Sequence, residues 1–66
     1  MCLSTVYDGA RSPDKVLLKN VQRVRLEPGR LVCTDLLEHE TVFEGSMREA
    51  DLVDGWIVLD RKETAR

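Results

Sequence analysis

Turn-forming residues recur at short intervals along this chain, and they leave room only for short segments between them. The clearest turns are Asp8-Gly9, Glu27-Pro28-Gly29-Arg30 and Asp54-Gly55. The intervening segments are rich in β-branched residues, and several alternate apolar with polar side chains, as strands do. This pattern predicts an all-β fold, either a small antiparallel barrel or a strongly bent sheet, similar in size to SH3 and Sm domains.

We expect strands over residues 2–7, 16–18, 21–26, 31–37, 41–44 and 56–60. Asn20 marks a kink between the second and third of these strands, and Gly45 ends the fifth. Ser46 followed by Glu49 resembles a capping box, which makes one helical turn an option within residues 46–53. Residues 62–66 form a polar tail.

A helix over residues 14–26 is the competing interpretation, because Leu17, Val21 and Val24 have helical spacing. We prefer strands, because Val is abundant there and the segment runs directly into the turn at Pro28-Gly29.

Alternation in the first strand sets Leu3 and Tyr7 on one face, which we expect to point inward, and Cys2 on the other. Residues 16–18 and 56–59 are apolar on both faces. A chain of 66 residues forms one small domain, residues 1–66, with a marginal core. Because such a domain hardly covers both faces of a strand by itself, we predict a homodimer.

Other properties narrow the class of protein. Two cysteines build no disulfide framework, no signal peptide precedes Cys2, and no apolar run approaches the ~20 residues that span a bilayer. We therefore expect a cytoplasmic protein with reduced thiols and no membrane contact. The formal net charge of −2, with acids and bases interspersed, argues against a dedicated nucleic-acid binder. The scarcity of candidate bases and nucleophiles indicates a binding or accessory module that is not an enzyme.

Cys2 is the best candidate for chemistry. Its thiolate could bind metal together with nearby backbone nitrogens, and a symmetric dimer would bring two copies to one axis. Two thiolates with two nitrogens form a square-planar set, which suits Ni(II) or Cu(II) better than tetrahedral zinc. The alternative is that Cys2 is an ordinary small apolar residue at a strand end.

The remaining candidates have simpler interpretations. Cys33 lies within a predicted strand and is expected in the core. His39, between Glu38 and Glu40, could be a nickel ligand, but we expect it to be a solvated turn residue. A basic edge of Lys19, Arg23, Arg25 and Arg30 would suit RNA phosphates, but acids lie close by and aromatic residues for base stacking are scarce. The acids that we expect at the surface are Glu49, Asp51, Asp54 and Asp60.

Four stretches together resemble the CooT family of small nickel-binding proteins associated with carbon monoxide dehydrogenase maturation. The stretches are Met1-Cys2-Leu3-Ser4-Thr5-Val6-Tyr7, Val16-Leu17-Leu18-Lys19-Asn20-Val21, Phe43-Glu44-Gly45 and Gly55-Trp56-Ile57-Val58-Leu59. The Met-Cys-Leu start is the most specific of them.

The resemblance implies a homodimer that binds about one Ni(II) per dimer between its subunits, through Cys2 of each chain. It also implies a client, a nickel enzyme such as carbon monoxide dehydrogenase or one of its other accessory proteins. It transfers no role to Cys33 or His39. The family has also been described as predicted RNA-binding proteins, which keeps a small RNA-binding module using Lys19, Arg23 and Arg25 as the alternative function.

Overall fold

The structure is a computed structural model and describes residues 3–61. It contains five strands, β1 (Ser4–Asp8), β2 (Val16–Glu27), β3 (Arg30–Asp35), β4 (Glu40–Asp51) and β5 (Trp56–Arg61), and one short 3₁₀ helix, η1 (Pro13–Lys15). The expected all-β class is therefore confirmed, and strands rather than a helix occupy residues 16–27.

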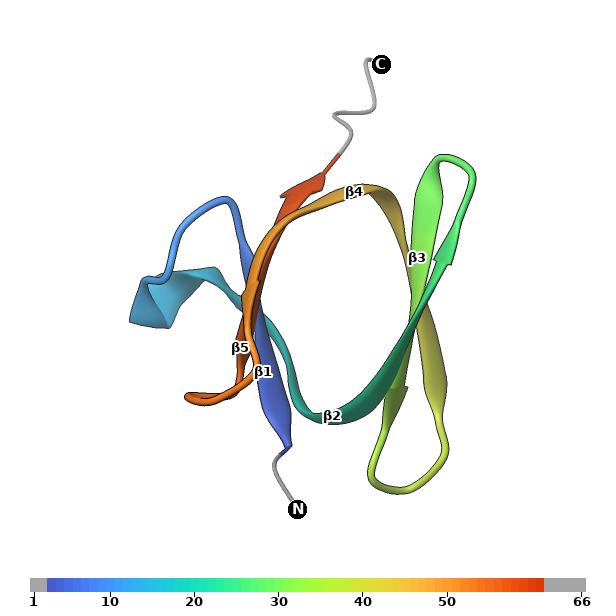
Figure 1. The fold of residues 1–66 in the computed structure, drawn as a ribbon, viewed down its shortest axis with the longest axis horizontal. Helices are drawn as coiled ribbons and strands as arrows, with labels where there is room; N and C mark the ends of the chain where they lie inside the picture. Colours follow the sequence, from blue (N-terminus) through green and yellow to red (C-terminus); the bar gives the residue numbers. More distant parts are fainter. Residues whose placement is uncertain (1–2, 62–66) are drawn as a thin grey trace.

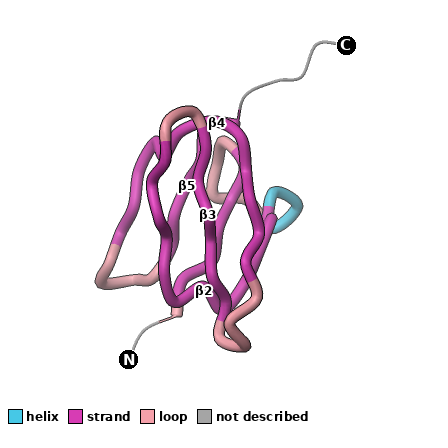
Figure 2. Tube along the Cα trace, turned by 90° about the vertical axis from the view of Figure 1, so that its right-hand side faces the viewer, coloured by secondary structure: helices cyan, strands magenta, loops and turns pink. Residues whose placement is uncertain are grey.

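The five strands form one closed sheet in the order β1-β2-β3-β4-β5 (Figures 1 and 2). Consecutive strands pair antiparallel, whereas β1 and β5, which close the ring, pair parallel. The sheet is thus antiparallel, as expected, except at this one pair. The reason is topological: when direction alternates along five strands, the first and the fifth run the same way.

The two longest strands each serve two neighbours. Strand β2 pairs with β1 through residues 16–21 and with β3 through residues 21–27, and β4 passes in the same way from β3 to β5. Asn20 (φ 60°) and Gly45 (φ 134°) lie close to these changes of partner. Their positive φ values let a strand bend without ending, and Figure 1 shows both strands curving strongly around the ring.

This bending corrects three expectations. Asn20 kinks one continuous strand, whereas we expected two separate strands. Gly45 does not end its strand, and the helical turn that was an option after Ser46 is strand, because residues 45–51 pair with β5. Cross-strand pairing with a strongly β-forming segment therefore overrides the local capping-box pattern. Strand β3 also ends at Asp35, so residues 36 and 37 belong to the following turn.

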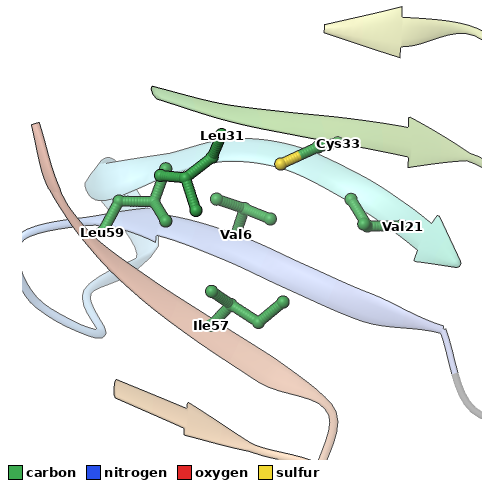
Figure 3. Packing of buried hydrophobic residues seen from close by; sticks show 6 residues of the cluster. All are labelled: Val6, Val21, Leu31, Cys33, Ile57 and Leu59. Carbon is green, nitrogen blue, oxygen red and sulfur yellow. The ribbon is translucent and has the colours of Figure 1, made fainter. Parts of the chain in front are cut away.

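The interior of the ring is filled by small and medium aliphatic side chains. Its buried members, shown in Figure 3, are Val6, Val21, Leu31, Cys33, Ile57 and Leu59. Val6 is fully buried, whereas Leu3 and Tyr7 are half-buried, so the expected inward face of the first strand is wrong. A five-stranded ring has a narrow interior, which accommodates Val more readily than Tyr.

The outer surface of the sheet is covered in places by the chain itself. Ile57 and Leu59 belong to the core, so Val58 between them lies on the outer face of the sheet. Val58 is nevertheless buried, and it pairs with Tyr7 on one side and Glu49 on the other. Val32, between Leu31 and Cys33, and Thr34, after Cys33, are buried in the same way. Because one chain already covers Val58, the two-sided apolar character of residues 56–59 does not by itself require a dimer.

Candidate functional site

Cys2, the candidate metal ligand, lies outside the described residues, and the structure shows the part of the fold that follows it. The backbone N–H of Thr5 donates to the carbonyl oxygen of Gly55 at 3.0 Å. A Cβ added to Gly55 would lie 3.1 Å from the carbonyl oxygen of Leu3. The beginning of β1 is therefore packed closely against the turn between β4 and β5, and both this tight approach and the φ of 84° at Gly55 favour glycine.

The register of the strands places this contact at one end of the ring. Trp56 pairs with both Thr5 and Asp51, and Val21 pairs with both Ser4 and Asp35. The β3–β4 turn (residues 36–39), the β4–β5 turn (residues 52–55) and the start of β1 consequently all lie toward the lower end in Figure 1, with the two turns on opposite sides of the ring. We call it the N-terminal end.

The two turns at the N-terminal end are built alike. In the first, Asp35 Oδ1 accepts from the backbone N–H groups of Leu37 (2.9 Å) and His39 (3.0 Å). In the second, Asp51 Oδ1 accepts from those of Val53 (3.0 Å) and Asp54 (2.9 Å). In each case two aliphatic residues follow the aspartate and point largely into solvent. Their exposed fractions are 52% for Leu36, 72% for Leu37, 78% for Leu52 and 87% for Val53.

Trp56 lies on the same end, beside the start of β1. The guanidinium carbon of Arg11 stands 4.2 Å from the centroid of the Trp56 ring, a cation–π contact. Within residues 3–61, the Trp56 Nε1–H is shielded from solvent and has no hydrogen-bond acceptor. Trp56 is the only tryptophan of the chain. Its fluorescence therefore reports on this end alone.

The other two candidate ligands are not brought together by the fold. Cys33 is fully buried in the core, where desolvation raises the pKa of its thiol, and its predicted core position is confirmed. His39 lies in the β3–β4 turn with its side chain 74% exposed, also as predicted, and its Nδ1 is 3.8 Å from Asp35 Oδ2. No cluster of three or more His, Cys, Asp or Glu residues suitable for a metal occurs within residues 3–61.

The predicted basic edge is largely neutralised by acids. Arg23 pairs with Glu38 at 3.3 Å, and Arg25 pairs with Glu27 at 2.9 Å. Arg30 also binds Glu27, so two guanidinium groups hold the pKa of that carboxyl below its usual value, with the hydrogen bond from Arg25 the largest cause. Of the three cations in the RNA hypothesis, Lys19 alone has no ion pair in the part of the chain that the structure describes. The arrangement is that of a solvated strand face.

Three of the four predicted surface acids are exposed, namely Glu49, Asp54 and Asp60. Asp51 is half-buried and instead holds the β4–β5 turn. Sequence reasoning missed this role and the matching role of Asp35. A repeated signal was present, since Asp35-Leu36-Leu37-Glu38 and Asp51-Leu52-Val53-Asp54 share an aspartate, two aliphatic residues and a second acid.

A protein-family model described as "CO dehydrogenase accessory protein CooT" matches residues 1–60. The chain belongs to the CooT family. It is thus a member of a family of CO dehydrogenase accessory proteins, and the match includes the Met1-Cys2-Leu3 start as well as β1 to β5 up to residue 60. The family resemblance inferred from the sequence is confirmed.

The CooT fold is also found in a solved structure. The crystal structure of "putative CooT from Carboxydothermus hydrogenoformans" matches with a TM-score of 0.78 and 18% sequence identity, covering 94% of this chain and 100% of that one. At this identity the likeness establishes the shared fold. The search of curated protein sequences found no match. Among residues 3–61, no helix is long and apolar enough to cross a membrane.

Proposed function

We propose that this protein is a nickel-binding accessory protein that serves the maturation of carbon monoxide dehydrogenase. In this proposal residues 1–66 form one cytoplasmic β domain that acts as a homodimer and catalyses no reaction. Ni(II) is its cargo, and two Cys2 thiolates, one from each chain, bind about one ion per dimer. The observation that carries the proposal is the CooT family match, which extends across Cys2.

The position of Leu3 supports a site at the N-terminal end. Consecutive Cα atoms are about 3.8 Å apart, so a metal bound by Cys2 would lie near Leu3 and the Gly55 turn. The end of a closed sheet is open to a second chain, whereas the interior is already filled by the core. An exposed thiolate can also exchange metal quickly, as a carrier requires. Affinity should fall on acidification, because each thiol must lose its proton before it binds.

Calorimetric titration with Ni(II) tests the proposal. The reduced wild-type protein should bind half a nickel ion per chain, and Cys2→Ser should abolish binding. Cys33→Ala is the matched control, because it removes the other thiol from a buried position and should leave the titration unchanged. Nickel binding by Cys2→Ser with wild-type affinity, or one ion per chain in the wild type, would contradict the proposal.

Two spectroscopic readouts locate the metal. Thiolate ligation should produce charge-transfer absorption bands that carboxylate or imidazole ligation would not. Nickel bound near Leu3 should also quench the fluorescence of Trp56, because Trp56 pairs with Thr5 at the same end. Binding without quenching would place the metal elsewhere on the molecule.

A further inference from the structure

The outer side of β1 and β5 forms one continuous patch of sheet. Thr5 pairs with Trp56, and Tyr7 pairs with Val58. Because Val6 points into the core, its neighbours Thr5 and Tyr7, with their partners on β5, lie on the outside of the ring. Thr5, Tyr7 and Trp56 are half-buried there, and β2 and β4 border the patch on its two sides. We call this patch the β1–β5 face.

The β1–β5 face is rich in the residue types that protein interfaces favour. Tyr7 and Trp56 are two of the three aromatic residues of the chain, and the third, Phe43, packs against the core. The guanidinium carbon of Arg11 lies 4.2 Å from the centroid of the Trp56 ring. Tyr, Trp and Arg are enriched where proteins associate, because they combine a large contact area with a polar group.

Opposite charges border the two sides of this face. Residues 9–20, which lead into β2 and form its first part, contain three cations and one acid, whereas residues 49–54 of β4 and its following turn contain three acids and no cation. In chain order they are Arg11, Asp14, Lys15 and Lys19 on the β2 side and Glu49, Asp51 and Asp54 on the β4 side. The register fixes these sides, because Val16 pairs with Tyr7 across β1 and Glu49 pairs with Val58 across β5.

The charges on the two sides are not satisfied by their own chain. Lys15, Lys19, Glu49 and Asp54 are exposed, and none of the ion pairs within residues 3–61 includes them. They are therefore available to a partner.

The other side of the ring differs. There β3 lies opposite β1 and β5 (Figure 1), and Arg23 and Arg25 are paired with Glu38 and Glu27 of the same chain. The charges of that side are thus already compensated.

A surface with cations on one side and acids on the other is complementary to a second copy of itself. Two copies that meet through one face are related by a twofold axis lying in that face. An axis across the strands would set cations against cations, whereas an axis parallel to the strands brings the β2 side of each copy to the β4 side of the other. The parallel axis also keeps the strand direction, so β1 of both copies starts at the same end of the dimer.

We propose that this chain forms its homodimer through the β1–β5 face, about a twofold axis parallel to β1 and β5. Lys15 and Lys19 of each copy then face Glu49 and Asp54 of the other. The existence of the dimer rests on the function proposed above, whereas the face and the direction of the axis follow from the register and the charges. Both chain starts lie at one end of this dimer, where a metal shared by the two Cys2 residues would be held.

Charge reversal with rescue tests the proposal. Sedimentation velocity over a concentration series, on reduced protein in EDTA, measures the dimer dissociation constant. Lys15→Glu/Lys19→Glu should raise this constant about 10-fold or more, and so should Glu49→Lys/Asp54→Lys. The variant with all four changes is the matched control, because its net charge is that of the wild type and opposite charges meet again across the axis. It should return close to the wild-type constant, and a four-residue variant as weak as either double variant would overturn the proposal.

A substitution at the centre of the face tests the contact without relying on ion pairs. Thr5→Arg should yield monomers, because it places two further cations close to the axis. Val42→Arg is the control, since Val42 is 54% exposed on β4 where that strand pairs with β3, and it should leave the dimer intact. Far-UV circular dichroism shows whether each variant is folded. A folded Thr5→Arg dimer beside a monomeric Val42→Arg would place the interface on the other side of the ring.

The failure of this proposal differs from the failure of the preceding one. A wild-type dimer that binds half a nickel ion per chain, and that none of the face variants weakens, would overturn the interface and leave the proposed function standing. Cys2→Ser should lose nickel yet remain a dimer, because the face does not depend on the metal. A wild type that dimerises through this face but binds no nickel would contradict the proposed function alone, and a monomeric wild type would contradict both.

Discussion

The two cysteines of this chain illustrate how position decides the chemistry of a single residue type. Cys33 packs among Val6, Val21 and Leu31 inside the ring, where its thiol is fully buried (Figure 3). Burial disfavours the thiolate, which is the form that binds metal, so Cys33 is poorly suited to be a ligand. Cys2 stands one residue before Leu3 in the chain and lies outside the described residues.

The Cys33 thiol predicts a loss of stability at high pH. Its pKa in the folded protein is raised above the ordinary value of 9.0, so the folded state keeps a proton that the unfolded state releases. The free energy of unfolding should therefore fall as the pH rises above about 9. Cys33→Ala should cost about 1 kcal/mol at pH 7 and reduce this fall. Urea titrations at pH 7 and pH 10 measure both effects. An equal fall in the free energy of unfolding between these pH values in wild type and Cys33→Ala would contradict the assignment.

At the scale of elements, the two bent strands make the ring possible. Strand β2 changes partner from β1 to β3 near Asn20, and β4 changes from β3 to β5 near Gly45. If two short straight strands replaced each bent strand, the sheet would have unpaired edges. A bent strand instead continues the hydrogen-bonded ladder from one neighbour to the next. The Asp-capped turns then connect β3 to β4 and β4 to β5 at a common end.

Substitutions at Asn20 test the bend. Its φ of 60° lies in the left-handed region, which a β-branched residue adopts at a cost of about 1–2 kcal/mol. Asn20→Val should therefore lower the free energy of unfolding by that amount, because the side chain is exposed and little packing changes. Asn20→Gly is the control and should remain within about 0.5 kcal/mol of wild type. Denaturation in urea measures both, and a neutral Asn20→Val would show that the strand does not need this conformation.

At the scale of the whole molecule, a chain of 66 residues has a small core and limited intrinsic stability. Ligands that bind only the folded state add to that stability by mass action. For a carrier of the kind proposed here, cargo and stability are therefore linked. The loaded dimer is expected to be the most stable form.

Thermal unfolding should show this linkage. At a nickel concentration 100-fold above Kd, the wild type should gain about 2.7 kcal/mol, or roughly 10 °C or more in Tm for a domain of this size. Cys2→Ser should show no gain, and Cys33→Ala should gain as much as the wild type from its own starting Tm. A nickel-dependent rise that survives Cys2→Ser would indicate a different binding site.

Local patterns in the sequence determined the class of fold and several individual placements. The turns around Pro28-Gly29 and Asp54-Gly55, the kink at Asn20, the core position of Cys33 and the exposure of His39 were all predicted, because each depends on backbone preference or polarity at its own position. The family was also recognisable from the sequence, chiefly from its Met-Cys-Leu start.

Only the tertiary structure decided which faces and ends come together. Val6 rather than Tyr7 points inward because five strands enclose a narrow interior, and residues 46–51 are strand because β5 pairs with them. Alternation in the sequence does not show which of two apolar faces points inward. A capping-box pattern does not show whether a distant strand pairs with the same residues. The shared end of the two Asp-capped turns is likewise a consequence of register, which depends on long-range pairing and not on the spacing of residues along the chain.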